Sequence, residues 1–205
     1  DGVAPVAKIK QQRSRRYKSW YQNEISRSIF NKVTEDVWNT AAITPGTKFM
    51  SYLDEMIANH FNEDRYLKLI KSVESIDVIG SNYYGEGEHK LFEYIRNNAE
   101  KHKSETTIIY GLDADLIMLS INHLHICPQI YLFRETPHFI QSIDSELEPE
   151  ANYYLDIPEL TKAIVQYMNN GRILTEKQSM DTIFDYIFLC FFLGNDFLPH
   201  FPAIN

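Results

Sequence analysis

The 205-residue chain is 44% hydrophobic and 13% aromatic, and its formal net charge is −8. A chain of this length and composition can bury one full hydrophobic core, so we expect a single domain over residues 1–205. The two cysteines, Cys127 and Cys190, lack zinc-ligand spacing, which excludes a zinc knuckle and a disulfide framework. The longest apolar run, 187–193, is too short to cross a bilayer, so no membrane partner is expected.

Apolar periodicity predicts two helices first, one from about Ala4 or Pro5 through Phe30 and one that follows Thr47. From residue 73 onward, strands and helices alternate. The predicted elements are a strand over 73–79, a helix over 88–101, a buried strand over 107–110, a helix over 116–124, a strand over 130–133, a helix capped by Asp156 and a last helix from about Asp181 to Gly194. This alternation favours an α/β fold with a mostly parallel sheet flanked by helices.

Two pairs of acidic residues follow predicted strands. Glu86 and Glu88 come after the strand at 73–79, and Asp113 and Asp115 come after the strand at 107–110. In an open parallel sheet, the ligand site lies beyond the carboxyl ends of the strands. We therefore expect the four carboxylates to face one site. The alternative is that each pair only lies near the positive N-terminus of the following helix.

A fifth acid, Asp196, follows the last predicted helix. A carboxylate is unfavourable at the negative end of a helix, and several converging carboxylates need a counter-charge. Hard oxygen ligands favour Mg²⁺ or Mn²⁺ over zinc. Two such ions about 3.5–4 Å apart can promote in-line hydrolysis of a phosphodiester. The acids therefore predict a two-ion phosphodiester hydrolase.

Other kinds of site fit the sequence less well. An EF-hand would need an oxygen ligand at Ile117 and a glycine at Met118. The sequence contains no P-loop, no GxGxxG and no serine or cysteine nucleophile with a plausible His/Asp setting. A DxD pair of the glycosyltransferase type stays open, but it does not explain the basic N-terminal segment.

Basic charge is concentrated near the N-terminus. Residues 1–18 carry six basic side chains and one acidic one, a net charge of +5, which leaves −13 for the rest of the chain. On a helix, one arc of about 100° holds Lys8, Gln12, Arg15 and Arg16. This face suits a terminal phosphate, and an ordinary solvated basic helix is the alternative. Three further cations project elsewhere and are interpreted as solvated charge: Lys10, Arg13 and Lys18.

Six segments follow one another along nearly the whole chain: Asp1-Gly-Val-Ala-Pro5, Lys8 with Gln11-Gln-Arg-Ser-Arg-Arg16, Ile43-Thr-Pro-Gly-Thr47, Gly85-Glu-Gly-Glu-His-Lys90, Gly111-Leu-Asp-Ala-Asp-Leu-Ile-Met-Leu119 and Leu193-Gly-Asn-Asp-Phe-Leu-Pro-His200. In this order, they resemble the first conserved region of the XRN family of 5′→3′ exoribonucleases. The combined match is highly specific, whereas each short segment alone would be weak.

The resemblance implies a PIN/flap-nuclease-like fold and Mg²⁺-dependent, processive hydrolysis of RNA with a 5′-monophosphate to mononucleotides. It implies six metal ligands, bound directly or through water: Asp1, Glu86, Glu88, Asp113, Asp115 and Asp196. It also implies that the 5′-phosphate is held by Lys8, Gln12, Arg15 and Arg16. A cap or a triphosphate would then be a steric block.

The chain departs from the family pattern in a few places. Val6 stands where the family usually has a basic residue, and Tyr84 where a proline is common. The family's initial strand, with its metal-binding aspartate and base-stacking histidine, does not precede Asp1, so a fragment without the N-terminal strand is expected. The nuclear branch's zinc knuckle is missing between Leu119 and Asp156, which favours a cytoplasmic or virus-encoded member. The lack of a disulfide framework already favours an intracellular setting. We expect a monomer.

Two other functions stay open from the sequence. A structure-specific flap DNA nuclease shares the carboxylates but should lack this basic face. A non-catalytic RNA-binding scaffold would not need intact acid pairs. Cleavage of 5′-phosphorylated RNA compared with flap DNA, and binding of Mg²⁺ or Mn²⁺, would separate the three functions.

Overall fold

The computed structural model describes residues 6–30, 42–61, 72–111, 113, 115–135, 142, 144–149, 151–195 and 198–203. Contacts along the chain divide it into two compact units, residues 1–87 and 88–205. The expectation of one domain over 1–205 stays a prediction.

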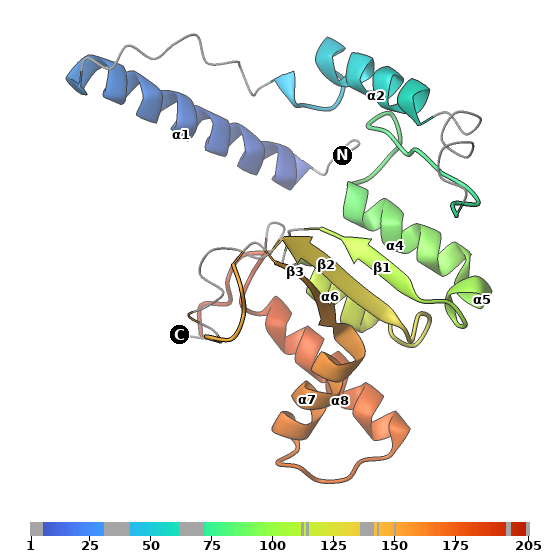
Figure 1. Ribbon diagram of the computed structural model, residues 1–205. Helices are drawn as coiled ribbons and strands as arrows, with labels where there is room; N and C mark the ends of the chain where they lie inside the picture. Colours follow the sequence, from blue (N-terminus) through green and yellow to red (C-terminus); the bar gives the residue numbers. More distant parts are fainter. Residues whose placement is uncertain are drawn as a thin grey trace. The chain divides into compact units, whose positions relative to one another are not determined.

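Two helices account for most of the described N-terminal unit (Figure 1): α1 spans Val6–Phe30 and α2 spans Lys48–His60. Both agree with the predicted helices. Thr47 begins α2, because its side chain accepts a hydrogen bond from the backbone N–H of Met50. The predicted strand over 73–79 is wrong, since this segment has no regular structure. No strand among the described residues pairs with it, and β-branched side chains alone do not make a strand.

The C-terminal unit contains a three-stranded sheet in the order β1–β2–β3. The strands are β1 (Thr107–Tyr110), β2 (Ile130–Glu135) and β3 (Asn152–Asp156). β1 pairs parallel with β2, whereas β3, which the sequence did not predict, pairs antiparallel with β2. The α/β class is confirmed, but the mostly parallel sheet is not, because one of the two described pairings is antiparallel.

Among the described residues, five helices accompany this sheet: α4 (Gly87–Asn97), α5 (Ala99–His102), α6 (Asp115–Asn122), α7 (Ile157–Met168) and α8 (Glu176–Phe191). The predicted helix over 88–101 is interrupted at Asn98, which has non-helical backbone angles and whose side chain donates a hydrogen bond to the Tyr94 carbonyl. α8 begins before the predicted Asp181, because Thr175 and Gln178 form a capping box.

The core lies between the sheet and its helices. α6 and α7 pack on β2, and α8 packs on α6 and α7 (Figure 1). Ile109, Ile130 and Leu132 are buried in this core. On the other face of β1, Ile108 and Tyr110 are 54% and 58% exposed, so this strand is buried on one face only, against the prediction. Within the described part of the chain, no helix combines the length and apolar character needed to cross a membrane.

Candidate functional site

The predicted phosphate-binding side chains share one face of α1, hereafter the phosphate face. Lys8, Gln12 and Arg16 follow one another at intervals of four residues and are half-buried, whereas Arg15 is exposed. The helical spacing that predicted this face is therefore present in the structure. Its binding role stays a prediction.

Lys8 contacts one of the predicted metal ligands. Its Nζ lies 3.8 Å from Oε2 of Glu86, and the two side chains are 17% and 8% exposed. The second carboxylate oxygen of Glu86, Oε1, is buried and has no hydrogen-bond partner among the described residues. Because a buried oxygen without a partner is costly, Oε1 is suited to bind a cation.

Arg16 is held by the loop before α2. Its Nη2 donates a hydrogen bond of 3.0 Å to the carbonyl of Ile43. The hydroxyl of Thr47 closes this loop, with Oγ1 2.6 Å from the carbonyl oxygen of Ala42 and 2.9 Å from that of Thr44. The sequence did not predict the Ile43 carbonyl as a partner of Arg16. The adjacent Thr-Pro-Gly turn was the one indication that the backbone there is held in a fixed conformation.

The turn that leads to Glu86 is anchored to α2. Asp54 of α2 accepts hydrogen bonds from the hydroxyl of Ser81 at 2.6 Å and from its backbone N–H at 2.9 Å. The hydroxyl is the main reason that the pKa of Asp54 is lowered. Gly80 permits this contact, because a Cβ there would lie 2.8 Å from Cγ of Asp54. Gly85 then turns the chain with a φ of +93°.

Asp113 and Asp115 lie just beyond the carboxyl end of β1, as predicted. β1 ends at Tyr110, and Asp115 is the first residue of α6. Gly111 approaches the side chain of Leu116 so closely that a Cβ at position 111 would collide with Cδ1 of Leu116. This close packing fixes the short connection that carries the two acids.

Three predicted ligands of the C-terminal unit converge. Glu88 in the first turn of α4, Asp113 and Asp115 each place a carboxylate oxygen within 4.8 Å of the other two. Glu88 is half-buried, and the two aspartates are exposed. Three carboxylates at this separation repel one another unless a cation lies among them. The arrangement is therefore suited to a divalent metal ion.

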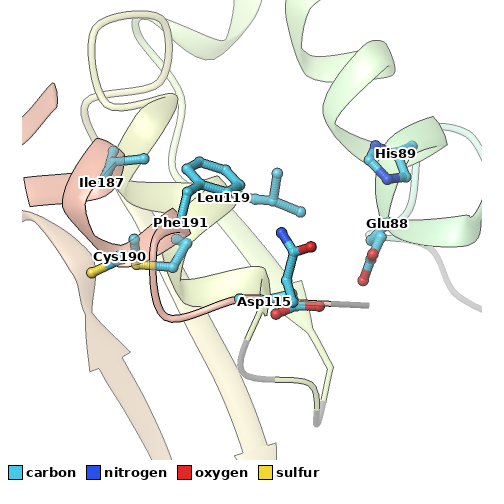
Figure 2. A pocket seen from close by; sticks show the side chains of 10 residues that line it. Glu88, His89, Asp115, Leu119, Ile187, Cys190 and Phe191 are labelled. Carbon is cyan, nitrogen blue, oxygen red and sulfur yellow. The ribbon is translucent and has the colours of Figure 1, made fainter. Parts of the chain in front are cut away.

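A cavity of about 240 Å³ lies beside these acids. Figure 2 shows the carboxylates of Glu88 and Asp115 at one edge of the cavity and Leu119, Ile187 and Phe191 along its apolar wall. The wall comes from α6 and α8, which the core holds together. The cavity thus combines a charged edge with an apolar surface that can contact a base or a sugar.

Two further polar residues line this cavity, and sequence reasoning did not select them. His89 follows Glu88 on α4, and Asn195 lies in the loop after α8. Each is adjacent to a predicted ligand within a segment of the family resemblance, which was the signal available. The backbone N–H of Leu198 donates a hydrogen bond of 2.8 Å to Oδ1 of Asn195, so the loop bends back after α8.

His123 fixes α4 against α6. Its ring lies 4.6 Å from that of Phe92 on α4, and its Nε2 lies 3.0 Å from Nη1 of Arg96. Its Nδ1 lies 2.7 Å from the carbonyl oxygen of Leu119. A neutral imidazole protonated at Nδ1 satisfies both contacts, and burial lowers the pKa of His123. Because α4 carries Glu88 and α6 carries Asp115, this contact positions two of the acids.

The two cysteines differ in accessibility. Neither forms a disulfide, and Cys127 is buried whereas Cys190 is half-buried. Cys190 also lines the cavity. Tyr186, one turn earlier on α8, has its pKa raised by burial and, less strongly, by Cys190.

Two predicted ligands, Asp1 and Asp196, lie outside the described residues, so their roles stay predictions. Of the six predicted ligands, the structure describes Glu86, Glu88, Asp113 and Asp115. Glu86 belongs to the N-terminal unit, and the other three belong to the C-terminal unit.

Known proteins are similar to this chain over its full length. The family model described as XRN 5′-3′ exonuclease N-terminus matches residues 1–136, and the Xrn1 helical domain matches residues 177–205. Over its full length, the chain is 32% identical to 5′-3′ exoribonuclease 2 of Arabidopsis thaliana, 34% to 5′-3′ exoribonuclease 1 of Schizosaccharomyces pombe and 31% to 5′-3′ exoribonuclease 2 of Saccharomyces cerevisiae. It spans 25%, 16% and 24% of the length of these relatives, respectively.

Proposed function

This chain belongs to the XRN family of 5′→3′ exonucleases, and from that premise we propose that the protein hydrolyses RNA from its 5′ end and releases mononucleotides. The observation that carries the proposal is the convergence of the carboxylates of Glu88, Asp113 and Asp115. Such a group suits metal-dependent hydrolysis of a phosphodiester. RNA is favoured over DNA because the relatives are named exoribonucleases.

The donor set fits hard divalent cations, Mg²⁺ or Mn²⁺, since every proposed ligand is a carboxylate. The buried Oε1 of Glu86, which has no hydrogen-bond partner among the described residues, supports a cation there as well. We propose that two ions are held by Asp1, Glu86, Glu88, Asp113, Asp115 and Asp196. When bound, the ions supply an activated water and stabilise the charge on the attacking and leaving oxygens.

The phosphate face binds the 5′-monophosphate in this proposal. Guanidinium groups bind phosphate oxygens through paired hydrogen bonds, and a terminal monophosphate carries more charge than an internal diester. Lys8 links phosphate binding to the metal site, because it belongs to the phosphate face and its ammonium group contacts the proposed metal ligand Glu86. A cap or a triphosphate extends beyond the terminal phosphate and is excluded by its bulk.

The same arrangement accounts for repeated cleavage. Attack of water on the first internal phosphorus, with the 3′-oxygen as leaving group, releases one nucleoside 5′-monophosphate. The remaining RNA then carries a new 5′-monophosphate, which is again a ligand for the phosphate face. Each turnover therefore regenerates the group that the phosphate face recognises, so cleavage can repeat along the strand, as the proposed processive decay requires.

The proposal extends to the setting of the protein. A cytoplasmic or virus-encoded enzyme of RNA decay is favoured, because residues 119–156 contain a single cysteine, Cys127, and therefore lack the zinc knuckle that the nuclear branch carries there. The monomeric state stays a prediction.

The test uses the full-length protein and one RNA sequence with a 5′-monophosphate, a 5′-hydroxyl or a 5′-triphosphate. We expect Mg²⁺-dependent decay of the monophosphorylated RNA alone, with that preference erased by Arg15→Ala together with Arg16→Ala. Equal decay of all three RNAs would contradict the phosphate face. Cleavage of flap DNA in preference to RNA would favour a structure-specific DNA nuclease, and metal-free RNA binding without decay would favour a scaffold.

A further inference from the structure

The opposite side of α1 carries aromatic and basic side chains that the proposed function does not use. Tyr17, Trp20 and Tyr21 are 65%, 56% and 52% exposed, and Lys10 and Arg13 are also exposed. At about 100° per residue, these five side chains lie within an arc of about 100° whose centre is about 140° from that of the phosphate face. α1 therefore presents two different surfaces.

The three aromatic rings form a group on the exposed helix. The ring centroids of Tyr17 and Trp20 are 5.7 Å apart, and those of Tyr17 and Tyr21 are 6.3 Å apart with nearly parallel planes. Between residues 10 and 21, every side chain within this arc is either aromatic or basic. Large exposed aromatic side chains gathered on one surface indicate a binding site more than a solvated helix face.

We propose that Lys10, Arg13, Tyr17, Trp20 and Tyr21, hereafter the stacking stripe, bind single-stranded RNA by stacking its bases. Aromatic rings offer a face to any base, and neighbouring cations neutralise the phosphates, so the combination binds single strands without sequence preference. The stripe spans about 16 Å from Lys10 to Tyr21, enough for roughly four stacked nucleotides.

Charge favours RNA over a protein partner as the occupant. The two cations lie at the N-terminal end of the stripe, and the first acid on this side of the helix is Glu24, which pairs with Arg27 at 3.3 Å. A stripe that met an apolar protein surface would bury Lys10 and Arg13 without counter-charges. A polyphosphate chain supplies those counter-charges along its whole length.

The proposal is independent of the proposed enzymatic function. Stacking requires neither a 5′-phosphate nor a metal ion. Binding is therefore measured by fluorescence anisotropy with the full-length protein, a labelled 5′-hydroxyl oligoadenylate of twelve nucleotides and EDTA. Failure of catalysis and failure of the stacking stripe then give separate results.

Tyr17→Ala and Trp20→Ala should each weaken binding at least about fivefold, because the stacking of one base on an aromatic ring contributes at least that factor to the affinity. Alanine favours the helix, so α1 should persist, and circular dichroism checks this. The matched control is Tyr167→Ala, which removes a tyrosine that is 87% exposed on α7, and it should leave the affinity unchanged. Lys10→Gln with Arg13→Gln should reduce the slope of log affinity against log salt by about 1.4.

A direct readout comes from Trp20 emission. The contribution of Trp20 to the fluorescence is the difference between the emission of the wild type and that of Trp20→Phe. Oligoadenylate should quench this contribution, and a duplex RNA of equal length should quench it much less, because the bases of the duplex are already stacked. Unchanged affinity in both Tyr17→Ala and Trp20→Ala would overturn the proposal. A blue-shifted, concentration-dependent Trp20 emission without RNA would also overturn it, and would identify the stripe as a protein interface.

Discussion

The acidic side chains of the two units differ in how their charge is balanced. In the N-terminal unit, Glu86 lies next to Lys8, and Asp54 accepts two hydrogen bonds from Ser81. In the C-terminal unit, Asp113 and Asp115 are exposed and converge with a third carboxylate. The first kind of acid is stabilised by the protein itself, whereas the exposed acids of the second kind lie close enough to one another to favour a cation among them, with little effect on stability when the cation is absent.

Glu86 combines both properties. Its Oε2 contacts Lys8, while its buried Oε1 has no hydrogen-bond partner in the described part of the chain. Charge balance therefore distinguishes structural acids from candidate metal ligands better than the presence of a carboxylate does. Mutation of the converging carboxylates should therefore reduce activity and leave stability nearly unchanged. Mutation of the residues that balance Glu86 and Asp54 should reduce stability.

The largest effect is expected from Asp113→Asn with Asp115→Asn. Metal-dependent RNA hydrolysis should fall by at least about 10³-fold, because charge stabilisation by bound ions amounts to several kcal/mol. Stability without metal should change by less than about 0.5 kcal/mol, since both side chains are exposed. Single-turnover decay and urea unfolding measure the two quantities. Asp185→Asn, an exposed acid on α8, is the control and should retain activity.

Lys8→Met tests an acid whose charge is balanced by the protein itself. It leaves the buried carboxylate of Glu86 without its cation, so we expect a loss of about 1–2 kcal/mol in EDTA, less than for a fully buried pair because Lys8 keeps 17% exposure. Saturating Mg²⁺ should stabilise this variant more than it stabilises the wild type. Urea unfolding with and without Mg²⁺ measures both effects.

The matched control for this prediction is Lys10→Met, which removes an exposed cation from the same helix. It should show the wild-type response to Mg²⁺. An identical Mg²⁺ response in Lys8→Met and Lys10→Met would show that Lys8 does not balance the charge of Glu86.

Ser81→Ala removes the protein's own partner of Asp54. We expect a loss of about 1 kcal/mol at pH 7, because a hydrogen bond to a half-exposed charged group is lost. The lowered pKa of Asp54 contributes stability above its ordinary value of 3.8, and this contribution is lost as the pH falls below that value. The variant should therefore lose less stability than the wild type between pH 5 and about pH 3. Ser75→Ala, at an exposed position, should follow the wild-type curve.

The smallest effect concerns the contact between α4 and α6. Burial lowers the pKa of His123, so below its ordinary value of 6.5 the unfolded chain binds the proton more readily than the folded one. Stability should decline as the pH falls from 7 through this value, and His123→Gln should make the decline shallower, while His102, whose pKa burial also lowers, maintains the remainder. His200→Gln, at an exposed histidine that does not act on the pKa of His123, should leave the decline intact. Thermal unfolding at a series of pH values provides the measurement.

Local patterns predicted local structure well. Helical spacing located α1 and its phosphate face, and Thr47 and Asp156 were recognisable as N-caps. The acids after β1 were predicted because a parallel strand directs its following loop to the ligand edge.

Non-local contacts were beyond sequence reasoning. The segment 73–79 has strand-forming residues, but a strand also needs a neighbour, and none pairs with it among the described residues. β3 was missed for the converse reason, since β2 provides its pairing partners. The carbonyl of Ile43 could not be predicted as a partner of Arg16, because every residue has a carbonyl and only folding selects this one.

The unequal exposure of the two cysteines has a practical consequence. Cys127 has 0% exposure, whereas Cys190 is half-buried in the wall of the cavity beside the acids. Thiol reagents react with accessible thiolates, so of these two cysteines Cys190 should be labelled much faster than Cys127. A fluorophore or spin probe at Cys190 would report when the cavity fills, and ligands could be ranked by how far they slow its alkylation.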